Sequence, residues 1–222
     1  AGKPATDILI ALGKYETTMA ELTQAAKERP LCRYDIKYEA HFAALLPHLS
    51  PLRNFVKSFT LRALAHQAND NPEAALADIR MGLFLAESVR DEPLLISQLV
   101  RIACLQIALQ PVWEGLKEEK WNAEQLAGIE KQLADIDLLE GYRISILGER
   151  DFANLVIAQM VITPKTYGEM VVGGFDMIGP VPQGWILGLV PQGWMRQNQR
   201  RLNEMHVNFS QRIVDTKARR IH

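Results

Sequence analysis

The stretch Leu94–Leu116, LLISQLVRIACLQIALQPVWEGL, decides the fold, because it is long enough for about six helical turns and apolar nearly all round. Such a helix lies at the centre of a domain or spans a membrane. A charge at mid-bilayer costs ~2.5–3.5 kcal/mol, and this stretch contains Arg101 and several amides, so we predict a core helix. The residues that we expect to be nearly inaccessible are Leu99, Ile102, Leu105 and Leu109.

Helical periodicity also fills the first half of the chain. Apolar residues at steps of three and four over residues 8–26 predict a first helix. Ser50-Pro51 and Pro72 mark the starts of two further helices, because proline suits the first helical position. The polar turn 69–71 joins these two helices into a hairpin.

Two capping boxes open helices after the central one, at Asn122 with Gln125 and at Asp137 with Glu140. A last helix starts near Met195. No convincing strand alternation interrupts these segments. We therefore predict an all-α fold, an array of about seven or eight antiparallel helices arranged as helical hairpins within a single domain.

An irregular segment, 168–194, precedes the last helix. Its glycines and prolines prevent long regular structure, although the segment is apolar. It repeats VPQGW at 181–185 and 190–194, with proline and glycine placed as in a type I turn. We expect a helical array over 1–167, this segment over 168–194, and a C-terminal helix over 195–222 that packs on the array.

The composition is that of a globular protein and excludes several classes of function. Of 222 residues, 48% are hydrophobic and 23% are charged, which rules out wholesale disorder. The net charge of -1 gives no global field that would steer nucleic acid or an anionic membrane toward the protein. Cys32 and Cys104 cannot build a disulfide framework. The sequence starts at Ala1 without Met, so we expect a processed or truncated product.

One hairpin resembles a tetratricopeptide unit. Residues 61–87 carry the resemblance, above all ANDNPEAAL at 68–76, which covers the turn and the start of the second helix. The resemblance covers one unit and implies stacked helical hairpins.

A broader resemblance covers most of the chain. CRY at 32–34, RDEPLLISQLVR at 90–101, WEGL at 113–116 and QNQ at 197–199 are similar to an uncharacterised family of bacterial helical proteins. Members carry an N-terminal apolar anchor or leader, which implies an extracytoplasmic, N-terminally anchored protein. The family has no assigned activity, so the resemblance implies no catalytic residue.

Ser97, Gln98 and Arg101 form the candidate buried polar cluster, because they share one side of the central helix. A buried guanidinium needs a partner, which we expect to be a carboxylate between Glu140 and Asp151. The favoured interpretation is a structural ion pair that fixes helix register. The alternative is an anion or carboxylate site that uses the guanidinium fork of Arg101.

The sequence contains no pattern typical of catalysis or of metal and cofactor binding. There is no nucleophile elbow and no phosphate-binding glycine loop. We therefore expect no catalytic residue, no cofactor and no metal site. The histidines, none of which has a second ligand at metal-binding spacing, are His41, His48, His66, His206 and His222.

The C-terminal helix is locally basic, with seven basic residues between Arg196 and Arg220. They circle the helix, so a solvated surface is favoured over binding to nucleic acid or anionic lipid, and no nucleic-acid partner is expected.

The segment 173–194 is the candidate interaction segment, with Phe175, Trp185 and Trp194 as its anchors. Leaving its apolar side chains in water is costly, so we expect Trp185 or Trp194, at least one of them, to be mostly buried within the chain. Self-association, a protein partner and a membrane surface are the alternatives.

On function, the sequence favours a non-catalytic helical interaction or scaffold module, because motifs for chemistry are missing and one hairpin is repeat-like. The family resemblance implies that this module lies at the bacterial envelope. The first alternative is a membrane-surface or lipid-binding protein that acts through 173–194. The second is an enzyme with a site around Arg101. Whether a small-molecule ligand binds is left open.

Overall fold

The computed structural model describes residues 4–29, 31–162, 191–210, 213–215, 218 and 220–221. Helices dominate these residues, which confirms the all-α fold. The chain divides into two compact units: unit 1 is Ala1–Ile36 with Leu45–Tyr142, and unit 2 is Lys37–Ala44 with Arg143–His222. The division between the units falls inside a helix, between Tyr142 and Arg143.

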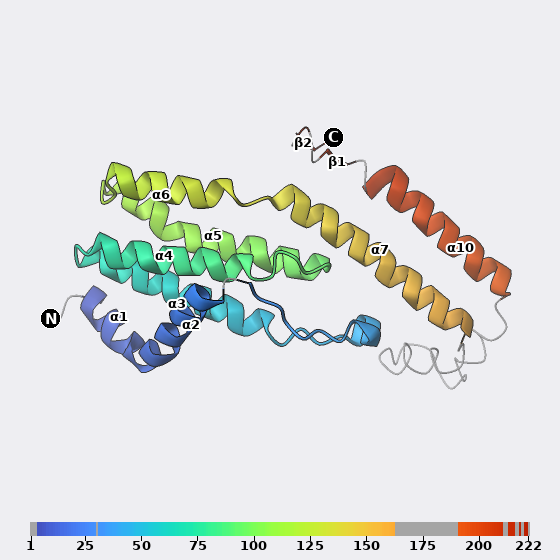
Figure 1. Ribbon diagram of the computed structural model, residues 1–222, viewed down its shortest axis with the longest axis horizontal. Helices are drawn as coiled ribbons and strands as arrows, with labels where there is room; N and C mark the ends of the chain where they lie inside the picture. The colour runs from blue at the N-terminus through green and yellow to red at the C-terminus, as the bar shows by residue number, and fades with distance from the viewer. Residues whose placement is uncertain are drawn as a thin grey trace. The chain divides into compact units, whose positions relative to one another are not determined.

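Each unit has its own set of elements (Figure 1). Unit 1 contains α1 (Pro4–Leu12), the 3-10 turn η1 (Gly13–Tyr15), α2 (Glu16–Glu28), α3 (Leu49–Ala68), α4 (Pro72–Glu87), α5 (Leu95–Lys117), α6 (Ala123–Ala134) and the first residues of α7 (Leu138–Ile162). Unit 2 contains the 3-10 helix η2 (Tyr38–Ala43), the rest of α7, α10 (Gln192–Met205), the π-helical turn η3 (His206–Ser210) and the strands β1 (Val214–Asp215) and β2 (Arg220–Ile221).

The first predicted helix is interrupted, because η1 separates α1 from α2. Gly13 weakens a helix interior, and a 3-10 turn has three residues per turn, which shifts the side chains that follow. As a result, Leu12 and Met19 are buried whereas Tyr15, which belongs to the same predicted stripe, is 43% exposed.

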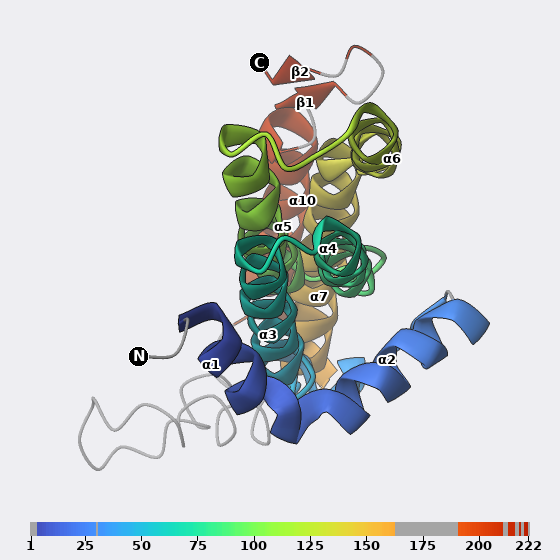
Figure 2. The ribbon, with the colours of Figure 1, turned by 90° about the vertical axis from the view of Figure 1, so that its left-hand side faces the viewer.

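The core of unit 1 lies where α3, α4 and α5 pack on one another. Figure 2 looks nearly along the axes of α3 and α4 and shows these helices beside each other. Phe59 and Val56 of α3, Ile79 and Leu83 of α4, and Cys104 of α5 are all fully buried. Burial raises the pKa of the Cys104 thiol, as expected for a small core residue in apolar surroundings.

The predicted burial is wrong for two of the four α5 side chains that were expected to be nearly inaccessible. Leu105 is buried and Leu109 is partly buried, but Leu99 is 54% exposed and Ile102 is 37% exposed. α3 and α4 cover only one side of α5, so the opposite side is left uncovered within unit 1. The apolar residues on every side of this helix predict that the rest of the chain covers it on every side, and this prediction fails here.

Among the described residues, α5 is also the one helix whose length and composition would suit a membrane span. The core helix of a globular domain meets the same criteria. Its packing on α3 and α4 and its buried, ion-paired Arg101 are the features of such a core helix.

The proline inside α5 is accommodated by a hydroxyl from α3. Pro111 has no N–H, so the carbonyl of Ile107, four residues earlier, loses its helical hydrogen bond. The hydroxyl of buried Thr60 donates to that carbonyl at 3.3 Å. The carbonyl of Pro111 itself accepts a 2.7 Å hydrogen bond from the side-chain amide of Gln67. The backbone around the proline is therefore satisfied by side chains of the neighbouring helix.

α3 and α5 end in the same kind of turn. Asp70 follows α3 with φ of 57°, and Glu119 follows α5 with φ of 53°. The next residues, Asn71 and Lys120, donate their backbone N–H groups to carbonyls five residues earlier, at 2.9 and 2.8 Å, which is the Schellman pattern. An ion pair of 2.5 Å between Lys120 Nζ and the Asp70 carboxylate connects the two turns.

Both predicted capping signals after α5 are confirmed in their main contacts. Asn122 and Gln125 form a reciprocal capping box at 2.9 and 3.0 Å, which opens α6. The carboxylate of Asp137 accepts the backbone N–H of Glu140 at 2.9 Å, which opens α7.

In unit 2, α7 and α10 lie side by side and are joined by side-chain amides of Asn154 and Asn203 (Figure 1). α10 starts at Gln192, three residues before the predicted start at Met195. No strand was predicted, and the structure adds a short antiparallel pair of β1 with β2, of two residues each. A pair this short needs no alternating pattern in the sequence.

Candidate functional sites

Arg101 lies in the interior of unit 1 together with Ser97 and Gln98, and each of the three is at most 4% exposed. The guanidinium makes a two-pronged ion pair with Glu87 at the end of α4. Its Nε and Nη2 donate to the two carboxylate oxygens, each at 2.7 Å. Its Nη1 donates to the side-chain carbonyl of Gln98 at 3.2 Å and to the backbone carbonyl of Asp137 at 3.4 Å. All three guanidinium nitrogens therefore have acceptors within the chain.

We predicted that a carboxylate between Glu140 and Asp151 would pair with Arg101. This prediction is wrong, because the partner is Glu87. The helix that follows α6 instead meets Arg101 at Gly141, where an added Cβ would lie 2.6 Å from the guanidinium Nη1. The guanidinium therefore occupies space that a side chain at residue 141 would need. Glu87 could have been found from the sequence, because the turn between α4 and α5 places residues at equal distances from it opposite each other.

A second polar cluster, which the sequence interpretation missed, adjoins the first. Glu92 is buried, and one of its carboxylate oxygens accepts the hydroxyl of Ser97. The other oxygen lies 2.8 Å from Nε2 of His48, although this contact is not aligned as a hydrogen bond. The ring of His48 stacks on Tyr34, with 4.1 Å between ring centroids. The cluster fixes the connector before α3 onto the turn between α4 and α5.

Tyr34 completes this cluster and is its most perturbed group. Its hydroxyl lies 3.0 Å from Oγ of Ser88, which in turn donates to the carbonyl of Leu85. Burial raises the pKa of Tyr34 to about 12, with a further contribution from Cys32. The phenol is therefore held neutral.

These contacts do not form a catalytic arrangement. A serine nucleophile is activated by a base that takes its proton, usually a histidine, with a carboxylate behind that base. Here the carboxylate of Glu92 stands between Ser97 and His48, and Ser97 is completely buried. No substrate can reach such a hydroxyl, so the cluster is one of structural contacts.

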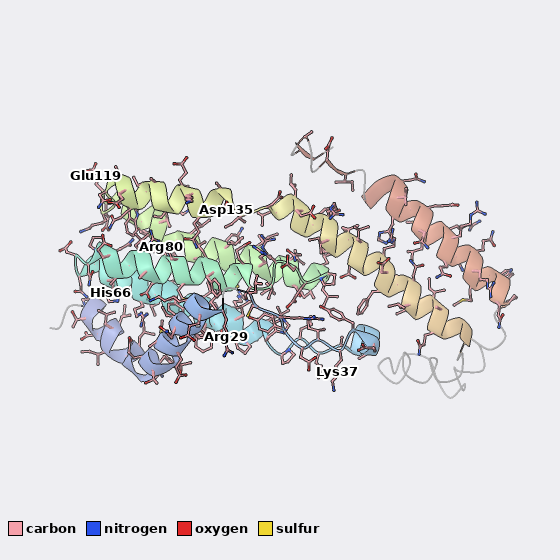
Figure 3. All side chains as sticks on the ribbon, in the orientation of Figure 1. Arg29, Lys37, His66, Arg80, Glu119 and Asp135 are labelled. Carbon is pink, nitrogen blue, oxygen red and sulfur yellow. The ribbon has the colours of Figure 1, made fainter. Side chains whose placement is uncertain are left out.

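A second buried ion pair joins α3 to α4. Arg62 donates to both oxygens of Asp78, at 2.9 and 2.7 Å, and to Glu16 of α2 at 2.8 Å. Burial raises the pKa of the Asp78 carboxyl, and Arg62 acts in the opposite direction. His66, which Figure 3 labels, lies 3.9 Å from the same carboxylate. Within the described ranges, no three His, Cys, Asp or Glu side chains could share a metal ion.

The uncovered side of α5 is the main surface feature of unit 1. We call it the apolar stripe of α5. Its residues recur at helical spacing and are 37–66% exposed: Ile96, Leu99, Ile102, Trp113 and Leu116. Exposed apolar residues gathered on one side of a helix mark binding sites more often than isolated exposed residues do.

The stripe leads into a groove between α5 and α6 of about 570 Å³. Glu119 and Asp135, labelled in Figure 3, lie just beyond the two ends of α6, which forms one wall. Among the groove's lining residues, Glu130 is the one charged side chain. The apolar lining consists mainly of Leu109, Val112, Trp113 and Leu116 from α5 and Leu126, Ile129 and Leu133 from α6.

The candidate interaction segment 173–194 lies mostly outside the described residues, and this includes Phe175 and Trp185. Trp194 is described, lies in the first turn of α10 and is 65% exposed. The burial expected for one of the two tryptophans is therefore not provided by Trp194.

Comparisons with protein-family models, with curated proteins and with solved structures returned no match.

Proposed function

We propose that this chain is a non-catalytic helical interaction module and that its α5–α6 groove binds an amphipathic helix of a partner protein. The observation that carries the proposal is the apolar stripe of α5, which continues into a groove with an almost wholly apolar lining. Trp113, at 66% exposed, stands at the junction of stripe and groove and is the expected energetic anchor. A position at the bacterial envelope is supported by the sequence resemblance alone.

The geometry of the groove favours a helix as the occupant. Its two walls are themselves helices, and their side chains recur at steps of three and four residues. Such walls form ridges into which the ridges of a third helix can pack. Helix-in-groove binding is a recurrent mode of recognition, in which the ligand presents apolar residues at the same spacing.

The charge in the groove specifies the partner further. Glu130 is exposed and lies among apolar lining residues, and no cation partner for it occurs in the portion of the chain that the structure covers. A partner helix would therefore carry Lys or Arg beside its apolar face. The enzyme alternative around Arg101 has less support, because the guanidinium is already paired with Glu87.

Two designed peptides test the proposal. Both are amphipathic helices with the same apolar face, and they differ only in a central Lys or Glu next to that face. We expect the Lys peptide to bind more tightly in fluorescence anisotropy, and Glu130→Lys to reverse the preference. Trp113→Ala should weaken binding about 30-fold, which corresponds to ~2 kcal/mol for an interface anchor.

Trp194→Ala is the matched control, because the two tryptophans are almost equally exposed, at 66% and 65%, and belong to different units. If the native chain and the Trp113→Ala variant bound each peptide with the same affinity, the groove would not be the binding site. Self-association that Trp113→Ala abolishes, seen by sedimentation without any peptide binding, would replace the partner helix with a second copy of this chain.

A further inference from the structure

We propose that the outward face of α10 binds an anionic bilayer surface. This site lies in unit 2, on a different helix from the groove, and does not depend on the function proposed for unit 1.

Contacts with α7 determine which face of α10 is turned inward. The side-chain amides of Asn154 and Asn203 each donate to the other's carbonyl oxygen at 2.9 Å. Gln199, one turn earlier on α10, donates to the backbone carbonyl of Asn154 at 3.5 Å. Such a polar pair fixes both the register and the rotation of α10 against α7, so the rest of its circumference faces outward.

The outward face combines apolar and basic side chains. Trp194, Arg201 and Met205 follow one another at steps of seven and four residues and therefore form one line along the helix. Trp194 is 65% and Met205 is 59% exposed. Arg196 and Arg200 are also exposed, but they lie well round the helix from this line, because residues two and six positions from Trp194 do not share its side.

The charge balance of this face is positive. Glu204 is the one acidic residue of α10 and pairs with Arg200 at 2.8 Å. Arg196 and Arg201 have no ion-pair partner in the described parts of the chain. Arg201 lies in line with an exposed tryptophan and an exposed methionine, and Arg196 adds an unpaired cation farther round the exposed part of α10. This combination matches a bilayer, whose surface carries anionic headgroups above an apolar interior.

A bilayer fits this combination better than nucleic acid does. Tryptophan is enriched at the level of lipid headgroups, and helices that lie in the membrane plane combine arginines with such a residue. Anionic lipids attract arginines near the surface. A nucleic-acid site would place several aromatic residues among its basic ones, whereas α10 has one tryptophan, in its first turn.

Co-sedimentation of the full chain with vesicles tests the site. The vesicles are phosphatidylcholine with and without phosphatidylglycerol. We expect binding to the anionic vesicles, weaker binding at higher salt, and a blue shift of tryptophan emission. The double variant Arg196→Gln/Arg201→Gln should weaken binding at least ~fivefold, because Arg201 alone, in line with Trp194, contributes ~1 kcal/mol. Trp194→Ala should weaken it as well and reduce the blue shift.

Matched variants in unit 1 provide the controls. Arg33→Gln/Arg53→Gln removes the same charge from other exposed positions, and Trp113→Ala removes an equally exposed tryptophan. Both should bind vesicles like the native chain. Equal losses in these controls, or binding that does not depend on phosphatidylglycerol, would overturn the proposal. Tight binding to duplex DNA that competes with the vesicles and is unaffected by Trp194→Ala would replace the bilayer with nucleic acid.

Discussion

Glu87 and Arg101 stand seven residues before and seven residues after Leu94 and meet through two hydrogen bonds of 2.7 Å. The ion pair therefore joins the last residue of α4 to the second turn of α5. The Arg101 side chain is 3% exposed and that of Glu87 is 20% exposed, so the pair is shielded from water chiefly on the arginine side.

Removal of Arg101 should be strongly destabilising. Arg101→Met leaves the carboxylate of Glu87 without its partner, and we expect a loss of about 3 kcal/mol in the free energy of unfolding. The double variant Arg101→Met/Glu87→Gln should lose less than the sum of the single variants in urea unfolding. Strictly additive losses would contradict the pairing. The exposed pair Arg150 and Asp151 is the control, and Arg150→Met should cost less than ~1 kcal/mol.

Two leucines of α5 that differ in exposure should respond differently to truncation. Leu105→Ala removes a side chain that is 6% exposed, and we expect a loss of ~2–5 kcal/mol. Leu99→Ala removes one that is 54% exposed and should cost less than ~1 kcal/mol. Thermal or urea unfolding measures both. A large loss for Leu99→Ala in the isolated chain would mean that its side chain is covered.

The neutral phenol of Tyr34 should make stability fall at high pH. Its pKa is raised by burial to about 12 from an ordinary value of 10.0, so the folded state holds the proton more tightly than the unfolded state does. This contribution is complete below pH 10 and is lost as pH rises toward 12. Tyr34→Phe should flatten the fall in unfolding free energy within that window, measured against Tyr15→Phe, whose ring is exposed.

The turn after α5 can be stabilised by glycine. Glu119 has φ of 53°, a conformation that costs a non-glycine residue ~1–2 kcal/mol. Glycine avoids this cost, but its larger loss of conformational entropy on folding offsets part of the gain. We expect Glu119→Gly to raise the free energy of unfolding by about 0.5–1 kcal/mol. Glu114→Gly, in the interior of α5, should lower it by a similar amount. If both variants changed the free energy of unfolding in the same direction, the positive φ at residue 119 would not determine the effect of glycine.

The features that the sequence predicted correctly are those set by residues close together along the chain. The capping signals at Asn122 and Asp137 and the turn before Pro72 all appear in the structure, because each is set by contacts within about four residues. The burial of Ser97, Gln98 and Arg101 also agrees with expectation, since they share one side of α5.

The partners of those residues depend on contacts between different helices. The turn between α4 and α5 is a sequence signal for Glu87, whereas His48 reaches the cluster through the packing of α3 on α5, which periodicity does not encode. The uncovered side of α5 was hidden for a related reason. An apolar residue reports a preference for burial, but it does not say whether this chain or a partner provides the cover.

The hydroxyl of Thr60 and the ring of Pro111 depend on each other, although 51 positions separate them. Replacing Pro111 with alanine would restore the backbone N–H that donates to the carbonyl of Ile107. Residue 60 would then no longer need a hydroxyl and could become valine. Replacing Thr60 alone would instead leave the carbonyl of Ile107 without a hydrogen-bond donor. Homologous sequences should therefore change the two positions in a fixed order, the proline before the threonine, and a helix that has lost both would be stiffer along the wall of the groove.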